Sequence, residues 1–301
     1  MLFKNRAPPC RGPLHCLYDA NPQRALELCA QEHVYWIQTG DLENVAYSLL
    51  AYGAILMVSG DCPQAKRVFE EGIRAWQHAD LAISARSDLF LVSLPMNISE
   101  LSLPSWVSAS LRFNYIFVTL AFVELLLGDA DRTHARLNQS RKFAHEAGAK
   151  VVEILADFLT TTLTLTSGHT DAATAQAFEC LRRFGQLGYG SGIVCSLIQV
   201  ADIVARRGDL RSACKLIGVA ESHLEALNDM VLYVAYIALV WHRQTQDTIV
   251  APTLAAARAA LGDAVFEAAY AEGQRMTLDE AVALALTNKC ISADSQRDPE
   301  P

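Results

Sequence analysis

Eight histidines and eight cysteines are the residues of this chain that could bind a metal or act as nucleophiles. Zinc sites are marked by closely spaced ligands, such as paired CxxC motifs or an HExxH helix. Neither motif occurs, and the cysteines lie at 10, 16, 29, 62, 180, 195, 214 and 290 without regular spacing. Scattered cysteines in a large helical chain are typical of reduced, buried small side chains. We therefore expect no metal site and no cofactor.

The signals for nucleophilic and acid–base catalysis are also weak. Ser191 lies between two glycines in YGSGIV, but this segment lacks the outer glycine spacing of a GxSxG elbow and follows no predicted strand. The carboxylate pairs at 70–71 and 279–280 are typical of solvated helix faces and caps. Paired acid–base chemistry needs a concave site, and the sequence identifies none. We expect that the chain is not an enzyme.

Charge and hydropathy argue against two classes of partner. The formal net charge of −8 leaves no basic excess to neutralise phosphates, so we expect no direct nucleic-acid binding. The most apolar run, residues 115–127, contains Glu124 and is shorter than the roughly 20 apolar residues of a membrane span. The N-terminus lacks the apolar core of a signal peptide. We expect a cytoplasmic protein that does not bind membranes.

One junction recurs along the chain and predicts its organisation. A glycine followed by a capping residue occurs at 128, 168 and 208, which are evenly spaced, and a further copy lies upstream at 60. The junctions are Gly60-Asp61, Gly128-Asp129, Gly168-His169 and Gly208-Asp209. Glycine supplies the backbone freedom that a tight turn between helices needs, and Asp caps the free amides of the next helix. Four copies in register indicate an internal repeat.

Small or apolar side chains recur at fixed offsets from each junction glycine. Small residues lie seven before, five after and twelve after it, where they let paired helices approach closely, and the ninth residue after it is apolar. In chain order the columns are Gly53, Ala121, Thr161 and Ala201; Ala65, Thr133, Ala173 and Ala213; Phe69, Leu137, Ala177 and Ile217; and Gly72, Ser140, Cys180 and Ala220. Each copy is a helical hairpin that must stack on its neighbours to bury its apolar stripe.

This pattern resembles the tetratricopeptide repeat (TPR). The sets Gly53, Ala65, Phe69, Gly72 and Ala201, Ala213, Ile217, Ala220 match the spacing of that family. The chain departs from it in having Asp157 at a large apolar position, in lacking a proline that closes each repeat, and in a period that is longer than the family's. The resemblance implies an all-α fold, a TPR-like helical-hairpin repeat array (α-solenoid) with a C-terminal helical cap.

The composition divides the chain into four expected parts. Residues 1–19 are a disordered N-terminus with three prolines, and the polar tail 288–301 is also disordered. Residues 20–228 form the repeats, interrupted by an irregular connection over 91–110, and residues 229–287 form the cap.

The first and last helices have recognisable boundaries. Asn21 and Pro22 start a helix that runs to Gln38. This helix is the second half of an incomplete repeat, so its apolar face suggests that something once preceded it. In the cap we expect a helix over 230–246, a break at Gly262, and a capping box that opens with Thr277.

The segment AAARAALGDAVFEAAYAEGQRMTLDEAVALAL closely resembles the C-terminal end of a large bacterial family. These are predicted signal-transduction ATPases of the STAND type, often fused to LuxR-type DNA-binding domains, in which a P-loop ATPase module precedes a TPR-like array. The resemblance covers residues 41–287 and is strongest over 251–287. The chain has no GxxxxGK[ST] loop and no recognisable helix-turn-helix, so neither ATP hydrolysis nor DNA binding carries over.

The resemblance implies a non-catalytic scaffold that binds a protein, a peptide or a small effector, as the regulatory arm of a STAND-type ATPase or transcriptional regulator. The expected partner is an ATPase module. Two alternatives stay open: a free-standing TPR-like adaptor, and an enzyme with an unrecognised site.

In tetratricopeptide arrays the first helix of each hairpin lines the concave face. Carried onto this chain, the outward positions form a mainly apolar groove for a partner helix or peptide. The predicted partner-binding residues are Tyr115, Val118, Phe122, Leu155, Phe158, Thr162, Ile198 and Asp202. Tyr115 and Phe158 are the expected aromatic anchors. The alternative is that a tightly wound array buries these positions as core.

Overall fold

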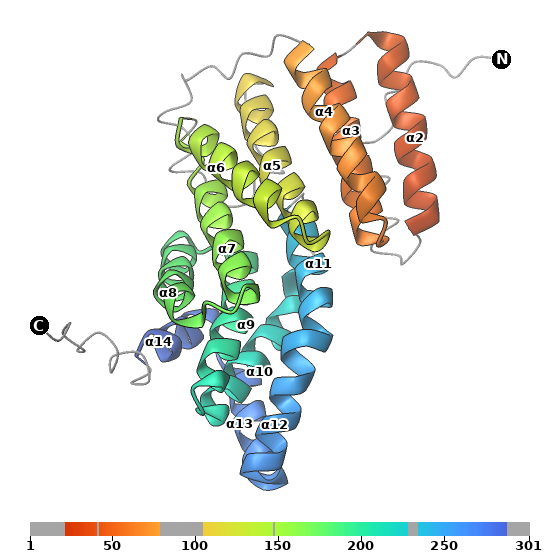
Figure 1. The fold of residues 1–301 in the computed structure, drawn as a ribbon. Helices are drawn as coiled ribbons and strands as arrows, with labels where there is room; N and C mark the ends of the chain where they lie inside the picture. The colour runs from red at the N-terminus through yellow and green to blue at the C-terminus, as the bar shows by residue number, and fades with distance from the viewer. Residues whose placement is uncertain (1–21, 41, 79–104, 147, 228–233, 288–301) are drawn as a thin grey trace, which may run out of the picture. The chain divides into compact units, whose positions relative to one another are not determined.

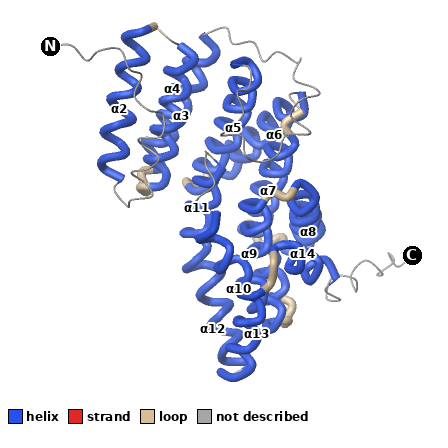
Figure 2. Tube along the Cα trace, turned by 180° about the vertical axis from the view of Figure 1, so that it is seen from behind, coloured by secondary structure: helices blue, strands red, loops and turns tan. Residues whose placement is uncertain are grey.

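The computed structural model describes residues 22–40, 42–78, 105–146, 148–227 and 234–287 (Figure 1). Over these residues the regular structure is helical throughout, with no strand (Figure 2). The expected all-α class is therefore confirmed. The predicted disordered segments 1–19 and 288–301 lie outside the described residues. Of the helices that the structure describes, none combines the length and the apolarity needed to cross a membrane.

The chain forms two compact units, Met1–Val152 and Glu153–Pro301. In the first unit each helix packs on the next one along the chain, and α2, α3 and α4 lie side by side (Figure 1). The helices of this unit are α2 (Pro22–Thr39), α3 (Leu42–Val58), α4 (Cys62–His78), α5 (Ser105–Leu126) and α6 (Ala130–Glu146).

The second unit contains most of α7 and the helices that follow it. Here α9 packs on α8 and α10, α13 packs on α10, and α14 packs on α8 and α9. The helices are α7 (Lys150–Thr166), α8 (Thr170–Leu187), α9 (Gly190–Arg206), α10 (Leu210–Leu227), α11 (Val234–Thr245), α12 (Ala251–Leu261), α13 (Asp263–Arg275) and α14 (Leu278–Thr287).

Left-handed glycines end the helices at regular intervals. Glycines with positive φ lie at 40 and 60, and again at 128, 148, 168, 188 and 208, so the step between neighbours is the same throughout both runs. At Gly60 the glycine N–H donates to the Met57 carbonyl (3.1 Å) and the next N–H donates to the Leu56 carbonyl (2.9 Å), which is a Schellman motif. The same pair of bonds recurs at the five later positions.

The repeating unit is therefore one helix and its turn, and the predicted period from one junction to the next contains two of them. Gly148 and Gly188 lie midway between the predicted junctions but are followed by Ala149 and Tyr189. A search for glycine followed by a capping side chain misses them for that reason. The interval from Gly60 to Gly128 is not a multiple of this step, and part of it lies outside the described residues.

The predicted aspartate caps are confirmed. The Oδ1 atoms of Asp61, Asp129 and Asp209 accept the backbone N–H groups of Gln64, Arg132 and Ser212 at 3.1, 3.2 and 3.0 Å. Each bond satisfies one of the free amides in the first turn of the helix. Glycine and aspartate together thus form a complete two-residue connection between antiparallel helices.

The predicted small-residue columns are buried in every copy. At Gly53 the reason is visible, because a Cβ atom built there would lie 2.6 Å from Cε1 of the Phe69 ring. The small residue seven positions before the turn thus makes room for the large residue nine positions after it. In the last copy these positions hold Ala201 and Ile217, both fully buried.

Two predicted boundaries are wrong. Helix α5 begins at Ser105, so the irregular connection predicted over 91–110 does not extend to its end, and residues 91–104 lie outside the described residues. In the sequence Pro104 stands directly before Ser105, and proline is common at helix starts because its missing N–H costs nothing there.

The helix predicted to end at residue 246 continues into α12 through a π-helical turn, Gln246–Val250. Across it the Ala251 N–H donates to the Gln246 carbonyl. Pro252 follows directly, and its ring would clash with a carbonyl four residues earlier in a regular helix. A wider turn at this point lets the helix pass the proline without ending.

The predicted features of the last segment are present. Gly262 separates α12 from α13, and Thr277 forms the capping box, its N–H donating to Glu280 Oε2 (2.8 Å) while its Oγ1 accepts the Glu280 N–H (3.2 Å). Helices α10 and α13 approach closely at two glycines. A Cβ atom on Gly273 would lie 2.2 Å from the Lys215 carbonyl oxygen, and one on Gly218 would lie 2.6 Å from that of Tyr270.

The repeat register predicts that Ala213→Leu is destabilising. Ala213 is fully buried, and the larger side chain would overpack the core at a cost of about 1–3 kcal/mol. Ala256→Leu is the matched control because Ala256 is exposed on a helix of the same unit. Chemical denaturation of both variants tests this, and an unchanged free energy of unfolding for Ala213→Leu would contradict the register.

Close helix contacts predict different outcomes at two helical glycines, Gly273 of α13 against α10 and Gly185 of α8 against α14. Gly273→Ala must push backbone against backbone, so the loss should exceed the roughly 1 kcal/mol that alanine gains over glycine in a helix. For Gly185→Ala the nearest atom is the side-chain Cγ1 of Val282 at 3.2 Å, which can move. Thermal melting should show a clear fall for the first variant and little change for the second. Equal melting temperatures would show that the helices separate at no cost.

Candidate functional site

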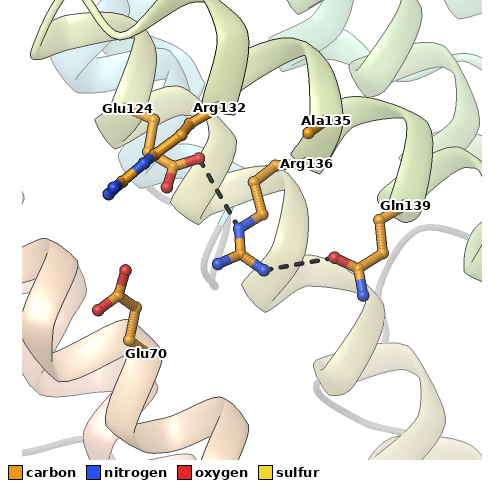
Figure 3. A pocket seen from close by; sticks show the side chains of 6 residues that line it. All are labelled: Glu70, Glu124, Arg132, Ala135, Arg136 and Gln139. Carbon is orange, nitrogen blue, oxygen red and sulfur yellow. Dashed lines mark hydrogen bonds and ion pairs between the residues drawn. The ribbon is translucent and has the colours of Figure 1, made fainter.

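A charged hollow of about 390 Å³ lies among α4, α5 and α6 in the first unit (Figure 3). Five of its six lining side chains are polar, whereas the surrounding array is packed with apolar residues. The lining residues are Glu70, Glu124, Arg132, Ala135, Arg136 and Gln139.

The Gly128 turn positions the basic side of this hollow. It folds α6 back on α5, and Asp129 both caps α6 and pairs with Arg132, through its Oδ2 atom at 3.3 Å from Nε. Arg132 and Arg136 are four residues apart and therefore share one helix face. That face lies over Glu124, near the end of α5 (Figure 3).

Glu124 is a fully buried carboxylate at the base of the hollow. Its oxygens form ion pairs at 3.4 Å with Lys66 Nζ and at 3.8 Å with Arg136 Nε. Neither pair is close enough or aligned enough to be a hydrogen bond, and within the described residues both oxygens lack a hydrogen-bond partner. Burying a charge without hydrogen bonds is costly, and local folding alone does not explain this placement.

Arg136 and Glu70 face each other across the hollow (Figure 3). The Arg136 Nη1 atom also donates to Gln139 Oε1 at 3.3 Å, which holds the guanidinium from a second side. The hollow thus presents guanidinium groups from α6 opposite a carboxylate from α4. Such an arrangement suits the binding of a small polar molecule that carries both hydrogen-bond donors and acceptors.

The eight predicted partner-binding residues lie on α5, α7 and α9, and most of them are core. Val118, Phe122, Leu155, Phe158 and Ile198 are each at most 4% exposed. Tyr115 and Thr162 are partly exposed, and desolvation raises the pKa of the Tyr115 hydroxyl. The expectation of an open apolar groove over the five buried positions is therefore wrong in this structure, and their burial favours the alternative that they are core.

In the second unit the chain itself covers part of this face. Helix α11 contacts α9, and the Trp241 ring meets the Phe158 ring edge-on with centroids 5.2 Å apart. Phe158 therefore cannot anchor a partner while α11 is in place. Asp202 is 8% exposed and pairs with Arg206 at 3.0 Å, and Thr162 accepts a hydrogen bond from Gln199 Nε2 at 3.0 Å. Both predicted polar positions thus have partners within the chain.

Asp157, the departure from the large apolar position, also has a structural explanation. Its Oδ2 atom accepts a hydrogen bond from Arg183 Nη1 at 2.6 Å, and the same guanidinium lies 3.8 Å from Glu153. The carboxylate thus links α7 to α8 where other copies use apolar packing.

The histidines and cysteines of the described residues do not gather into a metal-binding cluster. No group of three His, Cys, Asp or Glu side chains in that part of the chain could hold a metal ion. His33 Nδ1 lies 2.8 Å from Ser48 Oγ, which itself donates to the Val45 carbonyl, so the histidine nitrogen carries the proton. Burial raises the pKa of the Cys29, Cys180 and Cys195 thiols to about 12, which keeps them protonated.

Sequence analysis missed the hollow because its residues lie on three helices, and Glu70 on α4 is distant in the chain from the residues on α5 and α6. One signal was available: Glu124 is the carboxylate inside the most apolar run, 115–127, and two arginines follow it at 132 and 136. A charge at that place in a buried helix must be paired, and its partners come from neighbouring helices.

Comparisons with known proteins give no family for the chain. No protein-family model matches it, and no curated protein matches it by sequence. Among solved structures, the crystal structure of BtubC (BKLC) from P. vanneervenii aligns over 94% of this chain and 92% of its own, with 14% sequence identity and a TM-score of 0.45.

Two half-buried histidines, His33 and His242, predict that stability falls in mild acid. Burial lowers the pKa of His33 and His242, so below the unfolded value of about 6.5 the unfolded chain binds protons that the folded chain does not. The melting temperature should therefore fall as the pH drops from 7 toward 5. In His242→Gln the fall should be smaller, whereas exposed His134→Gln should behave as the parent chain. Identical pH profiles for all three proteins would contradict this assignment.

Proposed function

We propose that this chain is a non-catalytic, TPR-like scaffold that binds a small effector or a protein partner, as the regulatory arm of a STAND-type ATPase. The observation that carries the proposal is the charged hollow over Glu124, since it is a preformed concave site whose lining suits binding. A buried carboxylate with unfilled hydrogen-bonding capacity lowers the stability of the fold. Its presence here is therefore better explained by a role in binding than by a role in folding.

The TPR-like assignment is supported by the helix–turn unit. The chain has consecutive helices joined by two-residue glycine turns, with small residues where the helices approach closely. The tetratricopeptide hairpin is built in the same way. The unit, which runs for example from Gly128 to Gly148, is longer than half of the family period by nearly one helical turn.

The STAND-type assignment is supported by the resemblance of residues 251–287. In the structure this segment forms α12, α13 and α14, which pack back onto α8, α9 and α10. A terminal segment that covers the last hairpins is what a repeat array needs to keep its final apolar stripe from water. We accordingly propose a cytoplasmic protein whose main partner is a P-loop ATPase module.

The test is binding to such a module and the effect on its activity. The reading frame directly upstream should encode a P-loop protein, which can be expressed and titrated with this chain by isothermal calorimetry. We expect binding and a change in ATPase rate or nucleotide affinity of roughly 5-fold or more, the usual size of coupling between sites. An unrelated P-loop ATPase serves as the control.

Two outcomes would overturn the regulatory-arm assignment. One is an upstream frame with no P-loop, and the other is a P-loop module that neither binds this chain nor changes its ATPase rate in its presence. Either result leaves the free-standing adaptor as the remaining scaffold hypothesis.

A further inference from the structure

We propose that the hollow between α4 and α6 binds a free α-amino acid, with its carboxylate on Arg132 and Arg136 and its ammonium group on Glu70. The inference rests on the proposed function as an effector-binding scaffold and names the chemical class of the effector. It follows from the balance of charge in the lining, the size of the hollow and the unusual state of Glu124.

The lining carries two positive and two negative side chains, so its formal charge is zero. A ligand that is only anionic would meet Glu70 and Glu124 as well as the arginines. A ligand that is only cationic would meet Arg132 and Arg136. A zwitterion places each of its charges against the opposite one and leaves the net charge of the site unchanged.

The two signs lie on opposite walls of the hollow. Arg132 and Arg136 project from α6, and Glu70 reaches in from α4 (Figure 3). A guanidinium group binds a carboxylate through parallel N–H donors, and a carboxylate suits an ammonium group, so the two walls match the two ends of an amino acid. The ligand therefore bridges two helices and stabilises their contact.

The hollow has a suitable size. At about 30 Å³ per water molecule, a volume of about 390 Å³ holds on the order of a dozen waters. An amino acid of about ten non-hydrogen atoms fits with several waters remaining. The other lining residues are Ala135 and Gln139, which offer no large apolar surface. The favoured ligands are therefore amino acids with small or polar side chains, such as serine and glutamine.

Glu124 is a positioning residue in this arrangement. Its carboxylate lies 3.8 Å from Arg136 Nε, while Gln139 holds Nη1 of the same guanidinium. The ion pair and the hydrogen bond restrict the positions that the guanidinium can take before the ligand arrives. Pre-positioning a flexible arginine lowers the entropy cost of binding. This role in binding explains why the Glu124 carboxylate is buried.

The experiment compares matched ligands on the full chain by thermal shift and isothermal calorimetry. The probes are L-serine and L-glutamine, with N-acetyl-L-serine and L-serinamide as analogues that each lack one of the two charges. We expect the melting temperature to rise with an intact amino acid and to stay unchanged with either analogue at the same concentration. An absence of any shift with both amino acids, or an equal shift with an analogue, overturns the proposal.

Variants locate the site. Arg136→Gln and Glu70→Gln should each weaken amino-acid binding about 10-fold or more, as expected for the loss of one charge-assisted contact. Lys142→Gln is the matched control, because Lys142 is an exposed cation of α6 outside the hollow. Near-ultraviolet circular dichroism confirms that each variant is folded. Unchanged affinity in both pocket variants would place the amino acid elsewhere and overturn the proposal.

The role of Glu124 is tested by a double-mutant cycle. Glu124→Gln should weaken binding in the parent chain and have little further effect in Arg136→Gln, because it acts through that arginine. Additive losses would show that Glu124 does not act through Arg136. Amino-acid binding without binding of the ATPase module would sustain this inference and contradict the regulatory arm, whereas the reverse result would contradict only this inference.

Discussion

The left-handed glycine that ends α2, α3 and each helix from α5 to α9 is the constraint on which this architecture depends. With positive φ at one residue, two backbone hydrogen bonds close the helix and the chain turns back at once. Because the next helix starts two residues later, its apolar stripe faces the helix just completed. The constant spacing of these glycines then repeats the geometry. At Gly128 the same turn places Arg136 over Glu124, so the candidate site is a product of the repeat and not an addition to it.

Close packing and the polar hollow meet at neighbouring residues of α4. At Gly53 the Phe69 ring lies so close to the backbone that a Cβ atom would not fit. Directly after Phe69 on α4, Glu70 instead faces a hollow. A helix that is tightly packed on one face and lines a polar hollow on another can bind a polar molecule without a separate loop or lid. The lining of the hollow is carried by helices, whose backbones are held by the glycine turns.

Local features of the fold were predictable, and contacts between distant helices were not. Glycine turns, aspartate caps, the small-residue columns and the Thr277 capping box each depend on residues near one another in the chain. The occupation of the α7–α9 face by α11 depends on tertiary packing between segments that are distant in the chain. The hollow combines residues from 70 to 139, and its sequence signal, a carboxylate in an apolar run, indicates burial without naming its partners.

The buried thiols report when the helices around them separate, and each unit contains at least one such thiol. Cys29 lies in the first unit, and Cys180 and Cys195 lie in the second, all with the pKa raised to about 12 by burial. A thiol in that state is inert toward alkylating reagents until its helix separates from its neighbours, when its pKa returns to the ordinary range and it reacts. The labelling rates of these cysteines therefore measure how often the helices of each unit separate, and no probe has to be introduced.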